Sequence, residues 1–249
     1  MSLEPGPDET LDVLSRTLRI IQRKRGHRAT SDDVILAGIA SAQTTTPKRI
    51  LDLGSGKGTV ALLLLRRFPD ATAVGIEAFP ESHALAIRNA ALNQLEARYT
   101  PRMGDLRDPL PLADMASFDL ITGAPPFMPL GSGVLPQDPQ RAAGRFELKG
   151  GIEGYAHTAA AACGPKGRVV LLMDGRSAGR TENAFAAAGL ALHHRIAVHP
   201  RPGRPPVYWV FVGGHVSEPG CTTHWAMRGS AGDAWSAEYG ALRARLDLP

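Results

Sequence analysis

Short apolar segments alternate along the chain with longer segments whose apolar positions recur at helical spacing. Seven apolar segments have the length and composition of buried strands, namely 49–53, 72–78, 98–103, 118–122, 168–173, 190–198 and 207–213. Four of the intervening segments are rich in alanine or leucine, lack internal proline and predict helices, namely 59–68, 80–95, 147–163 and 177–188. Alternation of strand and helix is typical of a parallel sheet with helices on both faces.

The last two predicted strands depart from this alternation, because the turn-rich segment 200–206 joins them in place of a helix. Such a connection predicts an antiparallel hairpin at one edge of the sheet. The fold class expected is therefore α/β and Rossmann-like, with a mostly parallel seven-stranded sheet and an antiparallel edge hairpin.

The first 46 residues precede this alternation. Segment 8–21 predicts a helix with four apolar side chains on one face, Leu11, Leu14, Leu18 and Ile21. Segment 32–40 predicts a second helix, capped by Ser31 or Asp32. A piece of this size is too short to fold alone, so we expect residues 1–46 to be a helical extension that packs on a main domain, 47–249.

Composition narrows the class of protein. The 249 residues are 43% hydrophobic and 21% charged, as in ordinary globular chains, and two cysteines cannot build a disulfide framework. The longest strongly apolar run, 60–65, is far too short to span a bilayer. We therefore expect no membrane partner and, since no secretory leader opens the sequence, a cytoplasmic location.

Positive charge is modest in total and uneven in distribution. The sequence has 28 lysine and arginine residues and 24 aspartate and glutamate residues. Its arginines are concentrated in segments 16–28 and 195–204. These clusters are compatible with a polyanionic partner such as RNA, and equally with solvated surface.

A glycine-rich loop follows the first predicted strand of the main domain, in the sequence Leu-Asp-Leu-Gly-Ser-Gly-Lys-Gly-Thr from position 51 to 59. Glycines at a strand-to-helix turn let the backbone approach a ligand closely. The spacing does not match a P-loop, which has a glycine where Leu51 stands and a hydroxyl residue where Gly58 stands. A dinucleotide loop would place its pyrophosphate near Asp52, which is electrostatically unfavourable.

An acid at Asp52 suits a cationic ligand, and S-adenosylmethionine carries an amino group, a sulfonium and no phosphate. Two more acids end the next strands, with Glu77 placed to accept ribose hydroxyls and Asp105 placed to accept from the adenine amine. Three acids in register with three strands indicate a class I methyltransferase. The predicted cofactor-binding residues are Asp52, Gly54, Ser55, Gly56, Gly58, Glu77, Ala78, Gly104, Asp105 and Leu106.

The fourth strand of this domain is followed by Ala124, Pro125, Pro126 and Phe127. This segment resembles the N-P-P-[YF] signature of methyltransferases that act on planar nitrogens, which include adenine-N6 and release-factor glutamine enzymes. The resemblance implies that these four residues form the catalytic segment, in which Phe127 faces the acceptor and the Pro125 carbonyl contacts its amine.

Three further segments, 22–37, 145–147 and 198–206, resemble the bacterial tRNA(Val) adenine-N6-methyltransferase family, so the resemblance extends over residues 20–215. One position departs from the pattern, because Ala124 stands where the family has asparagine. An alanine cannot hold the acceptor amine, and loss of such a preorganised contact typically costs on the order of 3 kcal/mol in the transition state.

The leading interpretation is an S-adenosylmethionine-dependent methyltransferase that N-methylates a base in tRNA or other RNA. Two alternatives remain open: methylation of a small molecule or protein side chain, and an inactive RNA-binding relative. The histidines and cysteines show no ligand spacing, so no metal is expected. The loop 128–145 is equally compatible with a lid and with a surface excursion, and the oligomeric state is left open.

Overall fold

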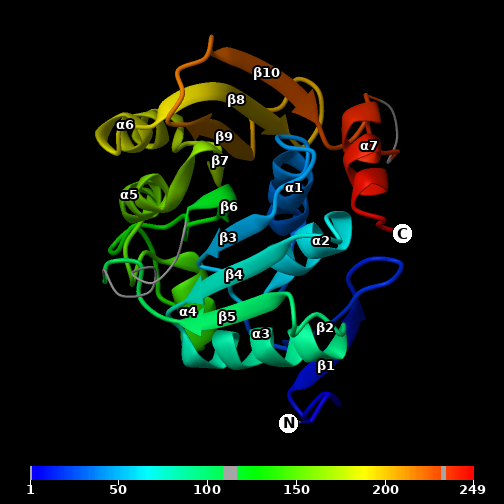
Figure 1. Cartoon of the computed structure of the whole chain (residues 1–249). Helices are drawn as coiled ribbons and strands as arrows, with labels where there is room; N and C mark the ends of the chain where they lie inside the picture. The colour runs from blue at the N-terminus through cyan, green and yellow to red at the C-terminus, as the bar shows by residue number, and fades with distance from the viewer. Residues whose placement is uncertain (1, 109–116, 231–233) are drawn as a thin grey trace.

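A computed structural model describes residues 2–108, 117–230 and 234–249 (Figure 1). An eight-stranded sheet forms its centre, in the order β10-β8-β9-β7-β6-β3-β4-β5. The strands are β3 (Arg49–Leu53), β4 (Thr72–Glu77), β5 (Tyr99–Met103), β6 (Phe118–Gly123), β7 (Cys163–Asp174), β8 (Ala191–His199), β9 (Tyr208–Gly214) and β10 (Cys221–Ala226). The helices are α1 (Ser31–Ala40), α2 (Thr59–Arg67), α3 (Pro80–Leu92), α4 (Pro139–Arg145), α5 (Ile152–Ala162), α6 (Ala178–Ala187) and α7 (Ala237–Arg245).

The strand directions place one edge of the sheet at the site. Strands β3 to β7 pair in parallel, while β9 is antiparallel to both β7 and β8. Consequently β8 runs in the same direction as β7, and the carboxyl ends of every strand except β9 meet at one edge. Ligands of open α/β sheets bind at this edge.

Each face of the sheet has its own hydrophobic core. One core packs α1, α2 and α7 on one face, with Ile35, Leu62 and Leu242 among its buried side chains. The other packs α5 and α6 on the opposite face, around Phe185 and Phe211. Figure 1 shows the sheet lying between these two groups of helices.

The seven predicted strands and four predicted helices of the main domain are confirmed, with ends shifted by a few residues. The strand count of seven is wrong, because β10 pairs in parallel with β8. The antiparallel hairpin β8–β9 is therefore not at the edge. The sequence of β10, Cys-Thr-Thr-His-Trp-Ala, is polar and mostly exposed, so it carries no apolar run that would have predicted a strand.

The predicted helix over 8–21 is wrong. This segment begins an antiparallel hairpin of β1 (Glu9–Val13) and β2 (Arg19–Arg23), with Leu11 opposite Ile21. Adjacent isoleucines at the start of β2 favour an extended backbone. In the turn between β1 and β2, two backbone N–H groups donate to Ser15 Oγ. This turn also interrupts the helical spacing of the apolar residues.

The N-terminal segment packs on the main domain, although it is not wholly helical. Asn89 of α3 uses its side-chain amide to bond both the N–H and the C=O of Ile21, at 2.7 and 3.1 Å. The same amide donates to the carbonyl of Lys57 in the glycine loop. The second predicted helix is confirmed as α1, but Thr30 is its N-cap, with its N–H donating to the Asp33 carboxylate at 3.0 Å.

Candidate active site

The glycine loop between β3 and α2 has the left-handed backbone that glycine tolerates. Gly54 and Gly56 have φ values of 62° and 55°, which L side chains rarely adopt. A Cβ added to Gly54 would also collide with the hydroxyl of Tyr155 on α5. The loop therefore brings bare backbone to the wall of a cavity, and Gly58 serves as the N-cap of α2.

Asp52 lies in β3 beneath this loop and is 2% exposed. Thr122 of β6 donates its hydroxyl proton to Asp52 Oδ1 at 2.8 Å. Oδ2 is buried and has no hydrogen-bond partner among the described residues. Burial raises the pKa of Asp52 to about 7, and the negative charges of Asp33 and Glu77 add to the shift. A cationic ligand would give this carboxylate the partner that it lacks.

Glu77 at the end of β4 is held by two backbone donors. Gly56 N–H donates to Oε2 at 2.8 Å, and Phe79 N–H donates to Oε1 at 2.6 Å. Burial raises the pKa of Glu77, although these two donors oppose the shift. Each carboxylate oxygen keeps a lone pair for a hydroxyl, which is the role predicted from the sequence.

Asp105 follows β5, but the structure places its carboxylate against arginine. Arg107 donates to Oδ1 through Nε at 2.9 Å and to Oδ2 through Nη2 at 2.7 Å, and Lys149 Nζ lies 3.6 Å from Oδ2. These hydrogen bonds from Arg107 hold the pKa of Asp105 at about 2. Its neighbours Gly104 and Leu106 line the same cavity as Gly54 and Glu77. A contact between Asp105 and adenine remains a prediction.

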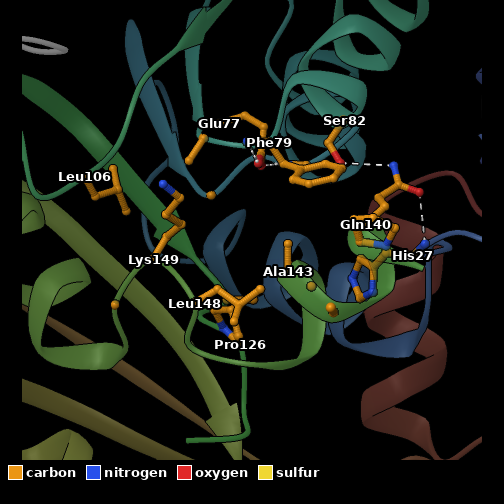
Figure 2. Close-up of a pocket in the computed structure, with 18 of the residues that line it drawn as sticks. His27, Glu77, Phe79, Ser82, Leu106, Pro126, Gln140, Ala143, Leu148 and Lys149 are labelled. Carbon is orange, nitrogen blue, oxygen red and sulfur yellow. Dashed lines mark hydrogen bonds between the residues drawn. The ribbon is translucent and has the colours of Figure 1, made fainter. Parts of the chain in front are cut away.

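The Glu77 cavity, of about 440 Å³, lies at the carboxyl edge of the sheet (Figure 2). This volume is within the range of about 300–1,000 Å³ found for small-molecule sites. Its wall includes six of the predicted cofactor residues, Gly54, Gly56, Glu77, Ala78, Gly104 and Leu106. Asp52 and Ser55 line a neighbouring cavity instead, and both are buried. A glycine cradle, the buried Asp52 carboxylate with its unpartnered Oδ2, and Glu77 with lone pairs left for hydroxyl donors fit S-adenosylmethionine.

Helix α4 covers the Glu77 cavity, and the sequence pattern predicts a loop here in place of a helix. Gln140 Nε2 donates to Ser82 Oγ at 3.0 Å, and Gln140 Oε1 accepts from the His27 N–H at 3.1 Å (Figure 2). A helix-start signal was present, because Asp138 caps the helix and Pro139 occupies its first turn. The loop 128–145 thus contains a cover that is joined to α3 and to the N-terminal segment.

The second cavity, here called the Asp52 cavity, has a volume of about 470 Å³ and borders the Ala124–Phe127 segment. Asp52, Lys57, Pro125 and Phe127 line it, and Phe127 packs against Tyr208 with ring centroids 6.1 Å apart. Pro126 lines only the Glu77 cavity. Five residues line both cavities: His27, Gly54, Gly56, Ala124 and Gly144. The predicted catalytic segment therefore stands where the two cavities meet.

Within the described part of the chain, no helix is long and apolar enough to cross a membrane. No cluster of three or more histidine, cysteine, aspartate or glutamate side chains there has the geometry to hold a metal ion.

Part of this site lies in a segment that is similar to known proteins. Residues 45–135 match the model of a family described as a methyltransferase domain. The tRNA1(Val) (adenine(37)-N6)-methyltransferase of Porphyromonas gingivalis is 34% identical over 149 residues, which cover 58% of this chain and 58% of that protein. A release factor glutamine methyltransferase of Rhodospirillum rubrum is 35% identical over 133 residues, covering 51% of this chain and 38% of that protein. The chain thus spans less than two thirds of the length of these curated relatives.

Solved structures share the fold at low identity. A predicted O-methyltransferase from Agrobacterium tumefaciens has a TM-score of 0.64 and 19% identity, covering 88% of this chain and 98% of that chain. A ribosomal protein L11 methylase from Lactobacillus delbrueckii subsp. bulgaricus has a TM-score of 0.53 and 17% identity, covering 82% and 97%. At these identities the likeness concerns the arrangement of strands and helices.

Proposed function

We propose that this chain, whose residues 45–135 match a methyltransferase domain family, uses S-adenosylmethionine to methylate a nitrogen of a base in tRNA or another RNA. The observation that carries the proposal is the junction of two cavities at Ala124. The Glu77 cavity has an acid and glycines suited to the nucleoside part of the methyl donor, and the other cavity contains Asp52 and opens beside Phe127.

The residues of the chain divide the binding work between the two cavities. Glu77 accepts from the ribose hydroxyls, and Asp52 faces the amino group of the methionine end. When bound, the sulfonium supplies an activated methyl group for in-line displacement. Alignment of donor and acceptor is then the main contribution of the protein. Phe127 offers a ring face against which a planar acceptor stacks.

Positive charge beside the Asp52 cavity supports an RNA substrate. Arg141 and Arg145 line this cavity and also a neighbouring hollow, which Arg25 lines as well. Arg25 and Arg141 form no ion pair with another described residue. Arg201 and Arg204 follow β8 at the same edge of the sheet. Arginines grouped in this way would contact phosphates on either side of a base that is turned out of its stack.

A second candidate is the amide nitrogen of a protein glutamine. Two observations favour it: the relatives include a release factor glutamine methyltransferase, and Ala124 leaves more room than an asparagine would. This reading keeps the same methyl donor and the same Glu77 cavity. The two candidates differ in what enters the Asp52 cavity.

The deciding experiment is transfer of tritium from labelled S-adenosylmethionine into total tRNA, total protein and small-molecule extract. Label confined to the tRNA fraction supports the proposal, whereas label confined to the protein fraction supports the second candidate. Calorimetry with S-adenosylhomocysteine tests the donor site separately. No binding of this compound together with no label would overturn the proposed activity, and binding without label would indicate an inactive relative.

A further inference from the structure

His27 occupies a position that the methyltransferase assignment leaves unexplained. It lies in the turn between β2 and α1, and it is one of the five residues that line both cavities. If Glu77 holds the ribose and Asp52 holds the methionine amino group, as proposed above, the sulfur between these parts would lie where the two cavities meet. A residue that lines both cavities would then lie beside the reacting atoms. Ala124, which shares this position, has no polar side-chain atom.

Two contacts fix the position of His27, one to its backbone and one to an edge of its ring. Gln140 accepts from the His27 N–H, and the Cγ–Nδ1 edge lies against Gly144 of α4. A Cβ added to Gly144 would come within 2.6 Å of both ring atoms, so only glycine permits this approach. Of the ring atoms, Cγ, Nδ1 and Cδ2 lie nearest to Gly144, and no ring nitrogen of His27 forms a hydrogen bond with a described residue.

The charges around His27 favour the neutral ring. Burial lowers the pKa of His27 to about 4, Lys57 of the glycine loop and Arg145 of α4 add to this shift, and Asp32 of α1 opposes it. Near neutral pH the imidazole is therefore uncharged, with a nitrogen able to accept a proton.

We propose that His27 accepts the proton that the acceptor nitrogen loses on methylation, at the junction where Ala124 offers no polar contact. The inference rests on the proposed function. The acceptor nitrogen forms a bond to the methyl carbon as the carbon–sulfur bond breaks, and the electron pair of that bond remains on sulfur. The nitrogen becomes positively charged and strongly acidic as the new bond forms, so even a weakly basic imidazole can take its proton at a ring nitrogen within the transition state. The proton passes afterwards to solvent.

The test compares His27→Ala with wild type in the tritium-transfer assay, using whichever fraction wild type labels. General-base catalysis typically contributes about 10²–10⁴-fold, so we expect kcat to fall at least a hundredfold. The Kd for S-adenosylhomocysteine should stay within threefold. Added imidazole should restore part of the lost rate, because it can enter the space left by the ring. His157→Ala is the matched control, since His157 is exposed on α5.

A second pair of variants tests the placement of the ring without removing it. Gly144→Ala must displace the His27 ring, and we expect kcat to fall at least tenfold with the fold intact by circular dichroism. Gly154→Ala, in α5, has no atom within 4 Å of the added Cβ and should keep the wild-type rate.

The outcomes separate the inference from the proposed function. A His27→Ala enzyme within threefold of the wild-type kcat, or one whose loss imidazole does not repair, overturns the role of His27 and leaves the methyltransferase proposal standing. A wild-type protein that labels no fraction overturns the proposed function, and the role of His27 with it.

Discussion

Gln140 of α4 donates its side-chain N–H to Ser82 Oγ of α3 at 3.0 Å, and both residues line the Glu77 cavity. The bond is buried, with Gln140 3% and Ser82 7% exposed. Since Gln140 also accepts from the His27 N–H, a single side chain joins α4 to α3 and to the N-terminal segment. Gln140 therefore links the cover over the proposed donor site to two neighbouring elements.

The first prediction concerns Gln140→Ala. The substitution leaves the Ser82 hydroxyl and the His27 N–H without this partner, and each unsatisfied buried group typically costs about 1–3 kcal/mol. We expect a lower melting temperature and a Kd for S-adenosylhomocysteine weakened about tenfold, measured by thermal shift and calorimetry. Gln43→Ala is the control, because Gln43 bonds the carbonyl of Ile39 at the far end of α1. Wild-type affinity in Gln140→Ala would show that the hydrogen bonds of Gln140 do not contribute to donor binding.

The second prediction concerns the pH dependence of donor binding. Burial raises the pKa of Asp52 to about 7, whereas its ordinary value is 3.8. Below pH 7 the protonated form of Asp52 therefore predominates in the ligand-free protein, and the folding stability that this protonation contributes is lost as pH rises through about 7. A cationic amino group binds the ionised form, so affinity for S-adenosylhomocysteine should increase by up to about tenfold per pH unit below pH 7 and then level off.

Asp52→Asn tests this assignment, because the amide has similar size and does not titrate. We expect its Kd to be weakened at pH 8 and to lose most of the pH dependence, as measured by calorimetry from pH 5.5 to 8.5. The pKa of Glu77 is also raised by burial, so Glu77→Gln is measured in parallel. If Asp52→Asn keeps the full pH dependence and Glu77→Gln loses it, the titrating group is Glu77.

Much of this arrangement follows from local sequence. The alternation of apolar runs with helical segments predicts β3 to β7 in a parallel sheet, and the acids at the ends of β3 and β4 follow from it because parallel strands share an edge. The glycines at positions 54, 56 and 58 mark the loop in the sequence. The structure explains them, because each has a positive φ value that most other residues do not adopt.

The parts that the sequence does not predict depend on contacts between distant segments. Arg107 donates two hydrogen bonds to the Asp105 carboxylate, two residues before it in the chain. No strand or helix pattern in the sequence predicts this contact. His27 and Gly144 meet although 116 positions separate them. The β1–β2 hairpin is hidden by leucines whose spacing also fits a helix, and its pairing is stabilised by α3 through Asn89. Tertiary contacts here override local spacing.

The third prediction concerns Asp105 and Arg107. If Asp105 accepts from the adenine amine, Asp105→Ala should weaken binding of S-adenosylhomocysteine about tenfold. Arg107→Ala, which leaves the carboxylate in place, should change the Kd less than threefold. Calorimetry on both variants at pH 7.5 makes the comparison. Equal losses in the two variants would mean that the pair acts only by holding the loop after β5.

The fourth prediction concerns the acceptor. Ala124→Asn supplies the amide found in the N-P-P-[YF] signature at the junction of the two cavities. If the natural acceptor is adenine, we expect its methylation in tRNA to rise by as much as about a hundredfold, since one preorganised polar contact is typically worth on the order of 3 kcal/mol. Nucleoside analysis of tRNA after reaction with both proteins gives the readout. Methyladenine formed only by the variant would exclude adenine as the natural acceptor.

The fifth prediction concerns the arginines that line the Asp52 cavity. Each phosphate contact adds to the salt dependence of binding, with a slope of log affinity against log salt of about −0.7 per contact for a single strand and −0.9 for a duplex. The double variant Arg141→Ala with Arg145→Ala should therefore weaken binding to total tRNA and reduce that slope by about 1 to 2. The control replaces Lys48 and Lys166 by alanine, because both are exposed near the amino ends of their strands, at the opposite edge of the sheet. Filter binding from low to moderate salt measures both slopes. If the two double variants reduce the slope equally, the arginines act only through net charge, and RNA does not approach the cavity from this side.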